Sequence, residues 1–218
     1  MQDKGVFMKT VCFLSLVLVL LFSCSRHRND IQEEDELPKA SSSSCEEDSL
    51  LYKTTEIGTQ TWLAENLNEV PVVGNSWCIS DAIPNMGYAC DKKRGRLYDW
   101  DAANSVCPCG WKLPSERDYN ILLKYAEGYA ENVFAGEVLK SANGWGDYGG
   151  LDLYGFAALP GGYRSSNGHF LKISEEAYWW SSSAEGDYAQ YRFVKDDKRL
   201  HSGSDRKTSG YSVRCIKH

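Results

Sequence analysis

The stretch Cys107-Pro108-Cys109-Gly110-Trp111-Lys112-Leu113-Pro114-Ser115 decides how this chain is held together. It places two cysteines one residue apart beside a tryptophan, and another cysteine, Cys215, lies close to the end of the chain. Distant cysteines in an exported domain are typical of disulfide bonds. We therefore expect a scaffold cross-linked by sulfur, in which this turn is joined to the last strand.

Six cysteines remain once Cys12 and Cys24, in the N-terminal segment, are set aside. An even number fits a disulfide framework, although many connectivities are open. The alternative is a metal site or a redox pair. However, Cys107 and Cys109 are separated by one residue and not by the two of a C-x-x-C motif, and no second pair of cysteines has the spacing of a zinc finger. A turn-rich loop between Cys78 and Cys90 favours that local pair. The pairings that we expect are Cys78 with Cys90, Cys107 with Cys215, and Cys45 with Cys109.

The N-terminal segment predicts an exported lipoprotein. Lys4 and Lys9 precede an apolar run over residues 11–22, and Ser23 then stands before Cys24. A basic region, a short apolar region and a small residue before the cleavage point are typical of a secretory signal. The run is shorter than the roughly 20 residues that span a bilayer. We expect residues 1–23 to be removed and Cys24 to carry lipid, which predicts an outer-membrane lipoprotein on the surface or the periplasmic face.

Residues 24–44 change from basic to acidic and end in a run of serines, without hydrophobic periodicity. Such composition buries no core, so we expect a flexible tether that reaches about 25 Å. Residues 45–218 contain every tryptophan and tyrosine and are expected to form one domain. The chain has a formal net charge of −6, and its sequence contains no basic stripe. This argues against nucleic acid as a partner. It also argues against electrostatic binding to an anionic membrane, so we expect the lipid alone to attach the protein.

The pattern of the domain predicts a hairpin over 51–62 around Gly58, a helix over 96–106, and a second helix that begins at Ser115 and ends at Gly128. Short β-rich runs follow at 156–159, 177–182, 189–195 and 211–217. Two early helices and a later antiparallel, loop-rich sheet predict an α+β fold.

Eight motifs follow one another in order along the domain. They are Thr61-Trp62-Leu63-Ala64-Glu65-Asn66-Leu67-Asn68, Ser76-Trp77-Cys78, Gly95-Arg96-Leu97-Tyr98, the stretch 107–115, Tyr154-Gly155-Phe156, Leu159-Pro160-Gly161-Gly162-Tyr163-Arg164, Tyr178-Trp179-Trp180-Ser181-Ser182 and Ser212-Val213-Arg214-Cys215. Together they resemble the Fibrobacter succinogenes major paralogous domain. The resemblance covers about residues 50–217 and implies a C-type lectin-like fold, akin to formylglycine-generating-enzyme-like domains. It also implies a secreted or lipid-anchored protein of Bacteroidetes or Fibrobacteres, and no catalytic activity is established for that family.

Polar residues of these motifs are suited to hydrogen-bonding the backbone of buried loops. Loops leave many N–H and C=O groups outside β ladders, and each buried group needs a partner. Ligand contact is the alternative role for the same side chains, but most side-chain hydrogen bonds go to backbone or water. We expect the structural role for Asn66, Asn68, Ser181, Ser182, Arg164 and Arg214.

Aromatic residues in the glycine-rich loops are the candidates for ligand binding. Rings at 178–180 alternate in direction along a strand, so at least one should face away from the main core. With Trp145, Tyr148 and Tyr163 in nearby loops, we expect a surface groove lined by some of these rings, on which a sugar face or a protein stacks.

Metal binding and catalysis are not predicted. The tripeptides Glu-Pro-Asn, Gln-Pro-Asp and Trp-Asn-Asp, which the resemblance associates with calcium in lectins, are absent, and Asp147, Asp152 and Asp187 are scattered acids. None of the histidines has the sequence context of a hydrolase or metalloprotease motif. Acid pairs such as Glu175-Glu176 are neighbours in sequence, whereas glycoside chemistry uses carboxylates that face each other.

The sequence therefore predicts a non-catalytic, lipid-anchored binding module of the cell envelope, without cofactors, that recognises a glycan or a protein. The alternative is a structural or assembly component of a surface fibre or envelope complex.

Overall fold

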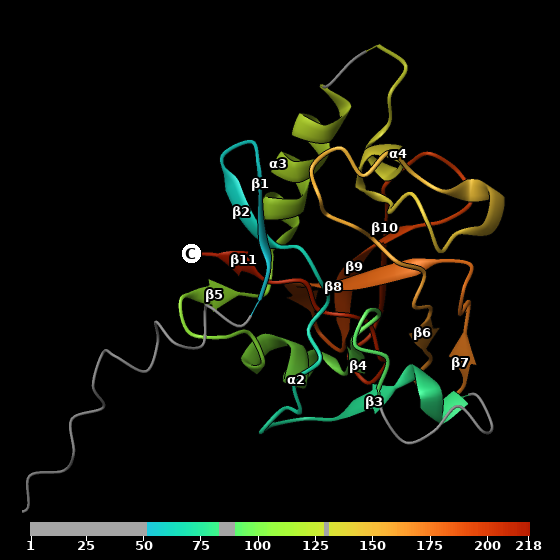
Figure 1. Ribbon diagram of the computed structural model, residues 1–218. Coiled ribbons are helices and arrows are strands. Elements are labelled where there is room, and N and C mark those ends of the chain that lie inside the picture. Colours follow the sequence, from blue (N-terminus) through green and yellow to red (C-terminus); the bar gives the residue numbers. More distant parts are fainter. Residues whose placement is uncertain (1–51, 83–89, 129–130) are drawn as a thin grey trace, which may run out of the picture. The chain divides into compact units, whose positions relative to one another are not determined.

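The structure, a computed structural model, describes residues 52–82, 90–128 and 131–218 (Figure 1). The expected signal peptide, the tether, Cys24 and Cys45 lie outside these residues. Few helices and several small antiparallel sheets make a mixed α and β fold. The helical elements are η1 (Ile79–Ala82), α2 (Trp100–Ser105), α3 (Glu116–Glu127), α4 (Ala135–Leu139) and η2 (Gly146–Tyr148). The strands are β1 (Thr54–Ile57), β2 (Gln60–Leu63), β3 (Ser76–Cys78), β4 (Arg96–Tyr98), β5 (Trp111–Lys112), β6 (Tyr163–Arg164), β7 (Phe170–Leu171), β8 (Ala177–Glu185), β9 (Tyr188–Val194), β10 (His201–Arg206) and β11 (Ile216–Lys217).

The predicted hairpin around Gly58 is confirmed. Strands β1 and β2 pair antiparallel from Thr54 opposite Leu63 to Ile57 opposite Gln60, and Gly58 takes a φ of 63° in the turn. Only glycine adopts this left-handed conformation without strain. The turn also lies against α3, where a Cβ on Gly58 would approach the ring of Tyr125 to 2.8 Å. The hairpin continues into a four-stranded sheet of order β1-β2-β11-β5.

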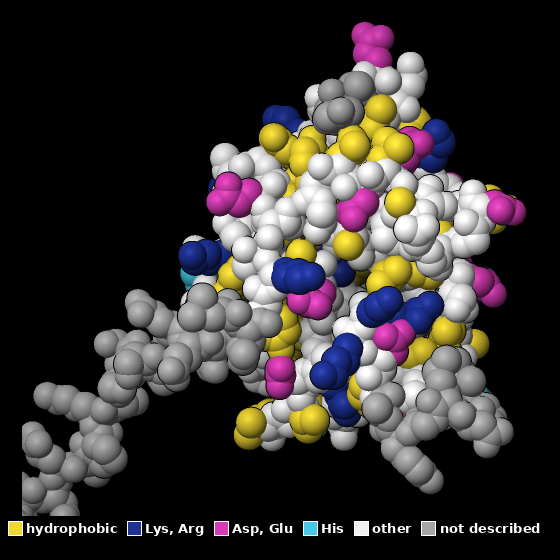
Figure 2. Space-filling view, viewed as in Figure 1, with side chains coloured by type: hydrophobic (Ala, Val, Ile, Leu, Met, Phe, Trp, Pro, Cys, Tyr) yellow, Lys and Arg dark blue, Asp and Glu magenta, His cyan; other side chains and the backbone are white. Residues whose placement is uncertain are grey.

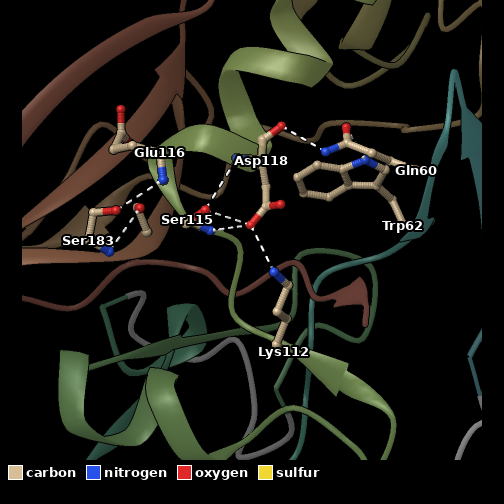
Figure 3. Close-up of polar contacts among 8 residues, drawn as sticks. Gln60, Trp62, Lys112, Ser115, Glu116, Asp118 and Ser183 are labelled. Carbon is tan, nitrogen blue, oxygen red and sulfur yellow. Dashed lines mark hydrogen bonds and ion pairs between the residues drawn. The ribbon is translucent and has the colours of Figure 1, made fainter.

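The second predicted helix, α3, is also confirmed, and its local sequence explains both ends. The Ser115 side chain accepts a hydrogen bond from the backbone N–H of Asp118, and the Asp118 carboxylate accepts one from the backbone N–H of Ser115 (Figure 3). This capping box satisfies two amide groups that the first helical turn leaves unpaired. Lys112 adds an ion pair to Asp118 at 3.2 Å, and Gly128 ends the helix.

The prediction of one helix over 96–106 is wrong in its first half. Residues 96–98 form β4, which pairs with β3, and the helix α2 begins only at Trp100. Asp99 separates the two elements because its carboxylate caps the amide of Ala102 at 2.9 Å and also accepts from the amide of Asn75 at 2.8 Å. Tertiary pairing therefore overrides the helical spacing of the apolar residues.

The later β-rich runs are confirmed at β8 and β9 and are mostly wrong elsewhere. Residues 156–159 contribute only an isolated bridge between Ala158 and Lys140, and of 211–217 only residues 216 and 217 form a strand. The helix α4 was not predicted from the sequence. Backbone bonds from Tyr98 to Tyr211 and from Trp180 to Ser212 still hold the segment 211–215 in place.

The rings at 178–180 of β8 point alternately to opposite sides, as predicted, but both sides are covered and none of the three rings is exposed. Trp179 packs in a cluster with α3, α4 and Phe156, whereas Tyr178 and Trp180 pack in a second cluster with α2 and Tyr211. Alternation along the strand directs successive rings to opposite sides. The result is two cores that share one strand.

A buried polar cluster joins three distant segments. The amide oxygen of Asn66 accepts hydrogen bonds from Arg214 at 2.7 and 3.0 Å and from the indole N–H of Trp179 at 2.8 Å. Arg214 also donates to the carbonyl of Phe156 and lies 4.3 Å from the centre of its ring. Arg214 and Asn66 thus have the structural role that the sequence predicts.

Two disulfide bonds are described, Cys78–Cys90 and Cys107–Cys215. Both are pairings expected from the sequence. Cys109 is also disulfide-bonded, while its expected partner, Cys45, lies outside the described residues. The second described bond closes a loop of 108 residues, for which the chain-entropy model gives about 4–5 kcal/mol of stabilisation.

Replacing Asn66 by alanine should destabilise the fold by about 3–5 kcal/mol. The substitution leaves the guanidinium of Arg214 and the indole of Trp179 buried without their shared acceptor, and an uncompensated buried charge is costly. Chemical denaturation monitored by tryptophan fluorescence would measure the loss.

Asn68→Ala is the matched control, because the buried Oδ1 of Asn68 has no hydrogen-bond partner among the described residues. It should cost roughly 1 kcal/mol or less. Equal losses for the two variants would contradict a special role for Asn66.

Candidate functional site

A surface groove with a volume of about 470 Å³ brings together two of the predicted aromatic residues and a set of charged groups. Its lining comes from three segments, namely residues 145–148 around η2, residues 172 and 174–176 before β8, and residues 195–196 after β9. We refer to it as the Tyr148 groove. Its volume falls within the roughly 300–1,000 Å³ that is typical of ligand sites.

The η2 wall combines a buried ring with an exposed one. Trp145 is only 4% exposed, and its indole N–H donates to the carbonyl of Ala158 at 2.9 Å. Tyr148 is 57% exposed, and its backbone amide donates to the carbonyl of Trp145 at 3.1 Å. The tryptophan therefore anchors the turn in the core, and the tyrosine ring is left available for contact with a ligand.

The second wall is a tight turn that uses unusual backbone conformations. Lys172 and Ser174 have φ angles of 60° and 65°, which non-glycine residues seldom adopt. Gly162 packs against this turn so closely that a Cβ would come within 2.4 Å of the carbonyl oxygen of Leu171. Strained turns persist only where the surroundings hold them. The Gly161-Gly162 motif thus fixes one side of the groove.

The third wall, residues 195–196 after β9, is held in place by the side chain of Lys140. Its ammonium group is buried and donates to the carbonyls of Lys195 at 3.1 Å and Asp197 at 3.0 Å, and it lies 5.2 Å from the centre of the Trp145 ring. Burial lowers the pKa of Lys140, and the acids Asp197, Asp196 and Glu137 offset this only in part. One side chain therefore links the η2 wall to the wall after β9.

Asp197 strengthens the same wall through its carboxylate. Both carboxylate oxygens lie within 3.0 Å of the Nε2 atom of His201. Burial raises the pKa of Asp197, but hydrogen bonds from the Arg199 amide and from His201 outweigh it, so the pKa lies below its usual value. This histidine therefore pairs with a carboxylate that supports a loop.

The groove is lined by four carboxylates and two lysines. Lys172 pairs with Glu175 at 2.9 Å and with Glu176 at 3.5 Å, and Glu176 also accepts from the hydroxyl of Tyr178. Lys195 lies 3.8 Å from Asp197, outside the lining. Asp147 and Asp196 form no ion pair within the part of the chain that the structure describes. Negative charge is in excess.

The structure brings together two of the three predicted ligand residues. Trp145 and Tyr148 line the groove, although Trp145 is largely covered. Tyr163 lies elsewhere, with its ring 4.8 Å from that of Tyr178 and 5.4 Å from that of Tyr211. The groove is thus lined by some of the three residues, as predicted, and Tyr163 is not among them because β6 places it in the aromatic cluster beside β8. Ligand binding by any of them stays a prediction.

Sequence reasoning did not single out Lys140 or Lys172. Acid pairs such as Glu175-Glu176 were considered only for glycoside chemistry, and the left-handed turn beside this pair contains no glycine that would signal it. Only the dense glycines at 144–150 pointed to an irregular loop here.

The remaining polar motif residues have mixed roles. Ser181 accepts a hydrogen bond from the amide of Ser183 at 3.2 Å, and the amide of Ser182 donates to the carbonyl of Pro114 at 2.8 Å. The guanidinium of Arg164 lies over the ring of Trp77 at 4.1 Å, and among the described residues it donates no hydrogen bond to a carbonyl. Its backbone pairs with that of Gly210.

A second, more apolar groove of about 670 Å³ is lined by Thr59, Ile121, Lys124, Tyr125, Gly128 and Tyr154. It has a single charged side chain, whereas the Tyr148 groove combines an exposed aromatic face with six charged side chains, which can hydrogen-bond a polar ligand. Among residues 52–82, 90–128 and 131–218, no three His, Cys, Asp or Glu side chains gather as metal ligands. Within the same ranges no helix has the length and apolar character that crossing a membrane requires.

These features define a disulfide-linked, loop-rich domain of mixed α and β structure with a polar surface groove. The model of the Fibrobacter succinogenes major domain matches residues 55–217, and the chain belongs to this family. No curated protein and no solved structure matches the chain.

Gly162→Ala should destabilise the domain by more than about 1 kcal/mol, since the new methyl group would meet the turn at Leu171 in addition to the cost of the left-handed φ of 65°. Thermal unfolding of the purified variant would measure this.

Gly146→Ala provides the control, because Gly146 has a similar φ of 59° but its Cβ would meet no atom within 4 Å. It should lose only the conformational part, about 1 kcal/mol. A Gly162 variant no less stable than the Gly146 variant would refute the close packing of the turn.

Proposed function

We propose that this chain is a non-catalytic, lipid-anchored binding module of the outer membrane, with a C-type lectin-like fold, that recognises a glycan in the Tyr148 groove. The observation that carries the proposal is an exposed tyrosine ring set among carboxylates and lysines on walls that the core holds in place. Sugar rings offer an apolar face for stacking and hydroxyl groups for hydrogen bonds, so such a groove suits them.

The distribution of surface charge favours binding in a defined groove over binding across a broad charged surface. On the face seen in Figure 2, Lys and Arg side chains are interspersed with Asp and Glu. Interspersed charge gives little long-range attraction for a polyanion. Recognition through a defined groove is therefore the better account of binding.

A role in assembly is the second candidate, and one observation favours it. The side chains of Val70, Val72 and Val73 are 73%, 101% and 56% exposed on one loop. Adjacent exposed aliphatic residues often mark contacts between proteins.

A glycan array probed with the full chain in detergent tests glycan recognition. We expect signals that depend on sugar identity and that weaken roughly 2- to 12-fold in Tyr148→Ala, which corresponds to an aromatic contact of about 0.5–1.5 kcal/mol. Stability should not change, because Tyr148 is exposed. Tyr188→Ala is the matched control, since Tyr188 is 46% exposed on β9 outside the groove.

A silent array would overturn the glycan proposal. Envelope proteins that co-purify with a chain that gives no array signal would then favour assembly.

Mass spectrometry of the mature protein tests the anchor. We expect a chain that begins at Cys24 with a diacylglyceryl group on its sulfur, and Cys24→Ser should abolish the lipid, whereas Cys12→Ser, within the signal, should not. An unmodified N-terminus in the exported protein would refute the anchor. Protease treatment of intact cells would then distinguish the surface from the periplasmic face.

A further inference from the structure

We propose that the Tyr148 groove selects glycans that carry a protonated amino group, such as chains of glucosamine without N-acetyl groups. The inference rests on the proposed glycan-binding function and adds the chemical class of the sugar.

The first argument is the excess of negative charge. Glu175 and Glu176 are compensated by Lys172, at 2.9 and 3.5 Å. Lys195 is directed to Asp197, at 3.8 Å. The carboxylates of Asp147 and Asp196 are left without an ion pair among the described residues, and they come from two different walls. A cationic ligand would supply the missing charge.

The second argument concerns the buried ammonium group of Lys140, whose hydrogen bonds go to backbone and not to the groove. It donates to two backbone carbonyls, at 3.0 and 3.1 Å, and lies 5.2 Å from the centre of the Trp145 ring. Its charge acts on Asp196. Asp147, on the η2 wall, is not among the acids that act on Lys140.

The third argument is the position of Asp147 directly before Tyr148 in the same short helix. The exposed ring offers a face for a pyranose, and the adjacent residue offers a carboxylate for a charged hydrogen bond. Because both side chains line the groove, a sugar chain that spans it and bears an ammonium group would contact both. A flexible basic peptide uses the charge but would lose more conformational freedom on binding, so the groove favours the sugar.

Isothermal titration of the full chain in detergent, with three β-1,4-linked tetramers, tests the inference. The probes are tetramers of glucosamine, of N-acetylglucosamine and of glucose. We expect the glucosamine tetramer to bind about two- to fivefold more tightly than the other two, as expected for one exposed charged contact of up to about 1 kcal/mol. The preference should decrease with added salt.

The variant Asp147→Asn should reduce this preference to within about twofold and leave binding of the glucose tetramer unchanged. Asp101→Asn is the matched control, because Asp101 is an exposed acid on α2 whose replacement changes the net charge equally. A preference lost equally in both variants would overturn a local role for Asp147.

The outcomes separate the two proposals. If none of the tetramers binds, glycan recognition fails and this inference fails with it. If the acetylated or neutral tetramer binds as tightly as the glucosamine tetramer, and Tyr148→Ala weakens it, only the selection for an amino group is overturned. Tighter binding of a tetralysine peptide than of the glucosamine tetramer would also overturn it, in favour of a basic peptide.

Discussion

The guanidinium of Arg214 is fully buried, and the groups that hold it are an amide oxygen, a backbone carbonyl and aromatic rings. No carboxylate forms an ion pair with it among the described residues. Burial lowers the pKa of Arg214 to about 10, and the group therefore stays charged at neutral pH. Because a buried charge needs several well-placed hydrogen bonds, Asn66 and Phe156 are tied to the segment before β11. The positions of the segment after the hairpin, of strand β8 and of the C-terminal segment all depend on this cluster.

The same requirement explains why a domain with so much loop holds together. Strand β8 is buried on both faces and uses its indole groups as hydrogen-bond donors, Trp179 to Asn66 and Trp180 to the carbonyl of Tyr98. Each of these bonds joins segments far apart in sequence. The disulfide Cys107–Cys215 adds a covalent link between the turn after α2 and the segment that carries Arg214. Core side chains thus form hydrogen bonds with backbone groups that lie outside the β-sheets, such as the carbonyl of Phe156.

Elements whose ends are set by local residues can be predicted from the sequence, whereas elements set by contacts between distant segments cannot. The helix α3 is found because Ser115 and Gly128 mark its ends, and the hairpin because Gly58 marks its turn. The strand β4 is missed because Leu97, Trp100 and Ala103 have helical spacing, while pairing with β3 is not visible in that pattern. Of the groove, Tyr148 is found from its glycine-rich loop. The turn at 172–176 is not found, since its left-handed residues are lysine and serine, and Lys140 acts through carbonyls more than fifty residues away.

The position of the groove follows from this construction. Its three walls are loops, yet each is fixed by a group that belongs to the core: Trp145 through Ala158, the 172–176 turn through Gly162, and residues 195–197 through Lys140. A ligand bound in this groove would meet walls that the core already orders, and the entropic cost of ordering loops would not be added to binding. Tyr148 is 57% exposed, and Asp147 and Asp196 form no ion pair among the described residues. Substitutions of these exposed side chains should therefore cost the scaffold little, so that one fold would serve different ligands by changes at such positions.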